Sequence, residues 1–327
     1  MRNGVLLLQE ITQVVQDTAR AGGNQIGLPI PLHGPSRPPP GFSFVDMLRQ
    51  LIQFIGYFLA IGAVGFRFGI VRRIRGITDE ARNVLRADNA AILGMLGVFL
   101  LLLSFVSGPY IESVRRKVVL EEVLSRNLSV FEFKLGMLAV ALIGFRLVRT
   151  DRSLGWALAS IGVVCSVLQP LYTGKLAGKV NAVHILAAAT WLGTLLVLTL
   201  IGIRGLIRSN ATGQQRAELV ADLVNSFSPL ALTAASIVAI TGATTAWLHL
   251  KRLSALYTTS YGMALITKLI LVSIVAMLGA WNWRRVRPSL GGEGSEEMIR
   301  RSATMELTFA GLVLIATSVL VTLPSPR

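Results

Sequence analysis

The chain has 327 residues, of which 53% are hydrophobic and only 15% charged, and its mean hydropathy is +0.62. A soluble domain carries about 25% charged residues, and a single core could not bury this much apolar surface, so the composition excludes a soluble globular fold. The net charge of +15 does not indicate nucleic-acid binding, because the basic residues lie mostly between apolar runs, where they orient membrane helices.

The sequence contains no motif of a known enzyme class. It has no Walker loop, no dinucleotide-binding fingerprint, no zinc-protease motif and no nucleophile with an evident base. Its single cysteine, Cys165, excludes an internal disulfide. We therefore expect neither an enzyme nor an ATP-driven pump.

The first residues do not suit a lipid environment. Residues 5–8 are too short for the apolar region of a cleaved signal peptide, and polar residues follow them directly. Residues 22–41 are rich in Gly and Pro and end in three prolines, which is typical of extended chain. We predict that residues 1–43 form an extension outside the cytoplasm that leads into the membrane.

Eight apolar runs follow, each close to the roughly 20 residues with which a helix crosses the hydrocarbon layer. The runs are too long for barrel strands and lack alternation, so the sequence predicts an all-α membrane bundle of about eight transmembrane helices. The third run is the shortest. In chain order, the predicted spans are Phe44–Phe66, Asn89–Ile111, Phe131–Phe145, Leu154–Leu171, Val180–Ile203, Phe227–Leu248, Gly262–Trp283 and Ala303–Leu323.

The distribution of Lys and Arg predicts the orientation of these spans. The loops after the first and the seventh span are the most basic, which favours a cytoplasmic position for both loops and an outside position for both termini. We divide the membrane part into an N-terminal half of four helices, residues 44–171, and a C-terminal half, residues 172–327.

Three sequence patches mark the C-terminal half. The first is His184-Ile-Leu-Ala-Ala-Ala-Thr-Trp191-Leu-Gly193. The second is Phe227-Ser-Pro-Leu-Ala-Leu followed by Thr241-Gly242, and the third comprises Tyr261-Gly262, Lys268 and Gly279-Ala-Trp-Asn-Trp-Arg284. In order and spacing, over residues 172–288, they resemble the copper-resistance D (CopD) family of membrane proteins. The first four spans match that family only in number and hydrophobicity.

This resemblance implies a multi-pass protein of the bacterial cytoplasmic membrane that moves copper ions toward the cytoplasm. It also implies a periplasmic copper-binding partner of the CopC type. Two positions depart from the family pattern: Lys175 stands where members often have His, and Asn181 stands where Asp is common. The loss of an imidazole and a carboxylate bears on copper specificity more than on the fold.

His184 and His249 are the first candidate metal ligands. Neutral imidazole binds copper well, and a polar side chain at membrane depth tends to face the bundle or a water-filled cavity. The predicted topology places both residues near the outer ends of successive helices, at similar depth. Hydrogen bonding to a neighbouring helix or to lipid headgroups is the alternative for each.

Met263, Cys165 and Met47 are further candidate ligands in the outer half of their spans, since soft sulfur ligands suit Cu(I). The same residues also serve as ordinary apolar filler. The chain has no Met-rich run and no Cys-x-x-Cys pair, so the sequence contains no strong metal motif.

Trp191, Lys268 and Tyr261 are candidates for lining or gating a pathway. Trp191 lies seven residues after His184, and Lys268 seven after Tyr261, so each pair shares a helix face. Lys268 is expected to repel or gate a cation, to extend its ammonium outward to the interface, or to pair with a carboxylate near the outer end of another span, namely Asp46, Glu112 or Glu132.

Three functions remain open. The leading hypothesis is a copper permease, in which the membrane potential favours inward movement by about 2.3 kcal/mol per charge per 100 mV. A haem-binding redox protein is the alternative, with His184 and His249 as axial ligands. The third is a membrane scaffold that helps to assemble a copper enzyme without transporting the ion.

Overall fold

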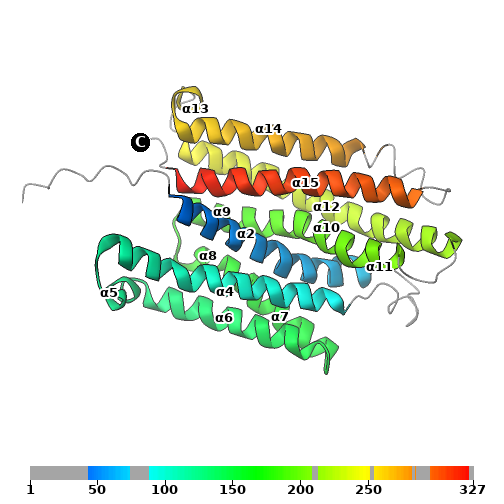
Figure 1. Ribbon diagram of the computed structural model, residues 1–327, viewed down its shortest axis with the longest axis horizontal. Coiled ribbons are helices and arrows are strands. Elements are labelled where there is room, and N and C mark those ends of the chain that lie inside the picture. The colour runs from blue at the N-terminus through cyan, green and yellow to red at the C-terminus, as the bar shows by residue number, and fades with distance from the viewer. Residues whose placement is uncertain are drawn as a thin grey trace, which may run out of the picture. The chain divides into compact units, whose positions relative to one another are not determined.

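The computed structural model describes residues 43–73, 88–207, 213–250, 254–281, 284 and 295–323; the predicted N-terminal extension lies outside them. These residues form helices and no strand, and eight of the helices are long and apolar enough to cross a membrane. The predicted all-α bundle of about eight spans is therefore confirmed (Figure 1).

The first four spans are formed by helices with short connections. They are α2 (Phe44–Gly65), which continues as the π-helical segment η2 (Phe66–Val71), α4 (Asn89–Arg116), α6 (Leu128–Leu147) and α7 (Arg152–Leu168). The short helix α5 (Leu120–Ser125) lies between α4 and α6, and α8 (Pro170–Thr173) extends the fourth span.

Polar residues define where these helices begin and end. The hydroxyl of Ser43 caps α2 by accepting from the amide of Asp46 at 3.3 Å, and the carboxylate of Asp151 caps α7 by accepting from the amide of Leu154 at 3.0 Å. Both caps satisfy amides that have no partner within the helix. α4 ends at Lys117, whose φ of 55° is left-handed.

The last four spans start with an irregular fifth. It runs through α9 (Leu176–Ala188), η3 (Ala189–Gly193), α10 (Thr194–Val197) and η4 (Leu198–Ile203) into α11 (Arg204–Ile207). The others are α12 (Gly213–His249), α14 (Ser260–Trp281) and α15 (Ser295–Thr322), with α13 (Ala255–Thr258) before α14. α12 begins 14 residues before the predicted sixth span, because a helix continues through polar residues that a search for apolar runs excludes.

α2 occupies the centre of the membrane unit. In its most apolar stretch 72% of the residues are buried, against 11% in α14. It packs against α4 and α7 of the predicted N-terminal half and against η3, α10 and α15 of the predicted C-terminal half. Residues 42–327 form one compact unit, in which both predicted halves share this helix.

Small residues allow α2 and the fifth span to approach each other closely. A Cβ atom added to Gly62 on α2 would lie 2.3 Å from the carbonyl oxygen of Gly193 in η3. Membrane helices commonly use glycine where two backbones meet. The glycine of the first sequence patch therefore marks a helix crossing.

α12 and α14 are the most exposed spans of the unit. α12 packs mainly against α9, and α14 mainly against α15, so that only 17% and 11% of their most apolar stretches are buried. Figure 1 shows α14 and α15 side by side along most of their lengths. The remaining faces are apolar and suit contact with lipid.

Candidate functional site

His184 points from α9 into the interface with α12. Its Nδ1 atom lies 3.0 Å from the hydroxyl oxygen of Thr241. The next residue, Gly242, leaves room for the ring, since a Cβ atom there would lie 3.2 Å from Cε1 of His184. Thr241 and Gly242 of the second patch thus contact the imidazole of His184 in the first patch.

The hydrogen bonds of Thr241 favour one tautomer of His184. The hydroxyl donates to the carbonyl oxygen of Ile237 at 2.6 Å. A hydroxyl has only one hydrogen, so toward the imidazole it acts as an acceptor and Nδ1 of His184 is the donor. The lone pair of Nε2 is then available to bind a metal ion, and a metal-binding histidine usually donates its other ring N–H in this way.

Lys268 brings a positive charge to the same part of the membrane. It lies on α14, is half-buried, and its ammonium acts electrostatically on the imidazole of His184. Tyr261, on the same face of α14, is 8% exposed and packs with Leu265 and Leu320. The structure therefore brings His184 and Thr241 into contact, and Lys268 of α14 is close enough to act on the imidazole only electrostatically.

Two of the three carboxylates that were predicted partners of Lys268 are occupied elsewhere. Asp46 pairs with Arg115, and Glu112 pairs with Arg116. Glu132, the third, is exposed on α6. The first ion pair connects the start of α2 with the end of α4, and the second lies within α4 itself.

His249 lies at a different level from His184. It is the last residue of α12, eight positions after Thr241, which corresponds to about 12 Å along the helix. His184 contacts Thr241, so the two histidines lie at different heights along α12. The predicted similar depth of His184 and His249 is therefore not found. α9 begins four residues earlier than the predicted span, and the side chain of His249 lies outside the described part.

The sulfur-containing candidates do not gather around His184. Met263 is 55% exposed on α14, on the face opposite the buried Tyr261 and Leu265. Met47 near the start of α2 and Cys165 in α7 are each half-buried. Within the described ranges no group of three or more His, Cys, Asp or Glu residues is arranged to hold a metal ion, so the roles of these three residues stay predictions.

Trp191 lies in η3, and its surroundings are mostly apolar. It is half-buried and packs against the main hydrophobic core. The π-helical turn that begins at Ala189 adds a residue to the helical repeat, which rotates Trp191 relative to the face expected from a regular helix. Its role in lining a pathway stays a prediction.

Thr241 was not among the predicted site residues. The available signal was a hydroxyl next to a glycine in the middle of an apolar span, on the helix that follows His184. Threonine hydroxyls are common in membrane helices, where they bond to their own backbone. Only the register between α9 and α12 shows that this one also contacts an imidazole.

The part of the chain that contains Thr241 and Lys268 is similar to a known protein family. The family "Copper resistance protein D" (CopD) matches residues 221–320, from within α12 to near the end of α15. The copper transport protein CutJ of Bacillus subtilis (strain 168) is 29% identical over 143 residues, or 44% of this chain. The chain spans about a quarter of that relative, 24% of its length. No solved structure matches the chain.

The matched region differs in extent from the predicted one. It begins at residue 221, so the first patch with His184 lies before it, and it extends beyond residue 288 into the last span. The second and third patches lie within it. The predicted resemblance to the CopD family is therefore confirmed for residues 221–320 of this multi-pass membrane protein, which match the model of that family.

Proposed function

We propose that this protein is a membrane permease for copper ions, and not an enzyme, and that His184 binds the ion during its passage. The observation that carries the proposal is the His184–Thr241 pair inside the α9–α12 interface, which leaves Nε2 as a ligand. The CopD match of α12 to α15 and the copper transport protein among the relatives support copper as the cargo.

The proposal includes a place and a direction. The protein would lie in the bacterial cytoplasmic membrane with both termini outside and would conduct copper inward, driven by the membrane potential. A periplasmic copper-binding protein of the CopC type would deliver the ion. The basic loops after the first and seventh spans support this orientation.

The haem alternative finds no support in the geometry. Axial ligation by two histidines requires both rings to reach one iron atom from opposite sides. His184 and His249 lie on levels separated by about 12 Å of helical rise, and Nδ1 of His184 contacts Thr241. An absorption spectrum of the purified protein without a Soret band is expected.

Transport is tested with purified protein in sealed liposomes loaded with a copper-sensitive dye, and metal analysis reports binding in parallel. The intact protein should bind copper and admit it to the lumen. His184→Ala should abolish most uptake, with His249→Ala as the comparison at equal protein content. Binding without uptake would support the scaffold function, and unchanged uptake by His184→Ala would remove this residue from the path.

Substitutions of Thr241 test whether its hydrogen bond positions His184 for metal binding or whether the side chain only packs against the ring. Thr241→Val keeps the side-chain shape but removes the acceptor for Nδ1–H of His184, so copper affinity should fall by roughly tenfold, as for other partners of metal-binding histidines. Thr241→Ser restores the hydroxyl and should retain near-normal affinity. Equal affinities for the Val and Ser variants, measured by competition with a copper chelator, would contradict the role of the hydrogen bond.

A further inference from the structure

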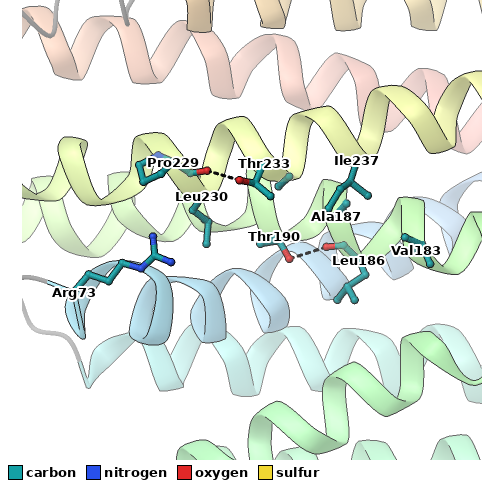
Figure 2. Close-up of a pocket in the computed structure, with 10 residues that line it drawn as sticks. Arg73, Val183, Leu186, Ala187, Thr190, Pro229, Leu230, Thr233 and Ile237 are labelled. Atoms are coloured by element: carbon teal, nitrogen blue, oxygen red, sulfur yellow. Dashed lines mark hydrogen bonds between the residues drawn. The ribbon is translucent and has the colours of Figure 1, made fainter.

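A groove lies between α9 and α12, on the side of this interface away from the end that carries His249. Its volume is about 370 Å³, within the roughly 300–1,000 Å³ of typical ligand pockets. Figure 2 shows residues of both helices facing one another across it. The apolar walls include Val183, Leu186 and Ala187 of α9 and Leu230, Ala234 and Ile237 of α12.

The two hydroxyls in the walls are already bonded. Thr190 donates to the carbonyl of Leu186 at 2.8 Å, and Thr233 donates to the carbonyl of Pro229 at 2.9 Å. Each bond lies within its own helix, as the dashed lines in Figure 2 show. Neither hydroxyl therefore has a hydrogen to offer a ligand, and the walls favour a hydrocarbon chain over a polar solute.

One end of the groove carries a positive charge. Arg73 follows η2, and Figure 2 shows its guanidinium directed toward Leu230 and Pro229. Within the described ranges no carboxylate forms an ion pair with Arg73. A guanidinium matches the geometry of a phosphate group and forms paired, charge-assisted hydrogen bonds with it.

A chain with an anionic head fits both features. The groove extends along α12 from Pro229 to Ile237, which is about 12 Å of helical rise. Basic pockets between transmembrane helices are known to bind anionic lipid headgroups. We propose that the groove binds an anionic phospholipid, with one acyl chain between α9 and α12 and the phosphodiester on Arg73. The groove lies in the same α9–α12 interface as the His184–Thr241 pair, and neither of these two residues lines it.

Native mass spectrometry of the purified full chain tests this site with phosphatidylglycerol and phosphatidylcholine of the same acyl chains. One phosphatidylglycerol should bind in preference to phosphatidylcholine. Arg73→Gln should weaken phosphatidylglycerol binding on the order of tenfold, as expected for the loss of a charge-assisted hydrogen bond. Arg72→Gln is the matched control, since Arg72 is exposed and adjacent but does not line the groove.

A second pair of variants tests the acyl chain. Ala234→Phe fills the groove and should reduce binding of phosphatidylglycerol, whereas Ala239→Phe, at an exposed position of α12, should not. Equal binding of the two lipids, or equal effects of Arg72→Gln and Arg73→Gln, would overturn the proposal. Displacement of the lipid by millimolar inorganic phosphate would also overturn it, because the site would then recognise an anion without a chain.

Discussion

Among single residues, Lys268 has the most unusual position for a protein that handles cations. It lies half-buried within the membrane span α14, and its ammonium acts electrostatically on the imidazole of His184 in α9. A charged side chain at membrane depth is expensive to retain. Because this charge acts on the proposed ligand, we expect it to limit how tightly a cation is held there, which favours release over storage.

Removing this charge should therefore strengthen binding. Lys268→Met keeps the length of the side chain, and copper affinity should rise by roughly tenfold, since like charges several ångströms apart repel by about 1–4 kcal/mol in a protein. Lys268→Arg retains the charge and should leave the affinity near that of the unchanged protein. A fall in affinity for Lys268→Met, in chelator competition at fixed pH, would contradict this repulsion.

Two features of this site, the candidate ligand His184 and the shared helix face of Lys268 and Tyr261, could be predicted from the sequence. An imidazole within an apolar run pointed to His184, and helical spacing placed Lys268 and Tyr261 on one face of a helix. The partner of His184 could not be predicted, because it depends on the register of α9 against α12. That register is seen only in the contact between His184 and Thr241, which the sequence does not encode locally.

At the scale of helices, the crossing of α2 with η3 depends on two glycines. Gly193→Ala would place a methyl group 2.3 Å from the carbonyl oxygen of Phe58, so the helices must separate, at a cost of about 1–3 kcal/mol. Gly136→Ala is the matched control, because nothing lies within 4 Å of a Cβ atom there. Thermal unfolding in detergent should show a lower midpoint for Gly193→Ala only.

The positions of the spans were predictable because apolar runs of about 20 residues have few alternatives to a membrane helix. The π-helical segments η3 and η4 were not, since they arise where the fifth span adapts to α2 and α15. Nor did the sequence distinguish central from peripheral helices. α14 is more apolar than α2 yet far more exposed, because lipid-facing and protein-facing residues are equally apolar.

At the scale of the whole molecule, the orientation in the membrane determines the direction of any transport. With both termini outside, a cysteine at Lys175, in the turn between α8 and α9, should react with an impermeant thiol reagent in intact cells. A cysteine at Arg72, after η2, should react only after the membrane is opened. Both variants use a Cys165→Ser background, and the reverse labelling pattern would invert the predicted orientation.

The central position of α2 also affects how the protein is made. α2 leaves the ribosome before the other described spans, yet it packs against α15, which is synthesised after them. During most of translation, the face of α2 that later meets α15 lacks its native neighbour and is covered by lipid or by the insertion machinery. A nascent chain that stalls before α15 would present this face, and incompletely packed surfaces of this kind are what cellular quality control recognises.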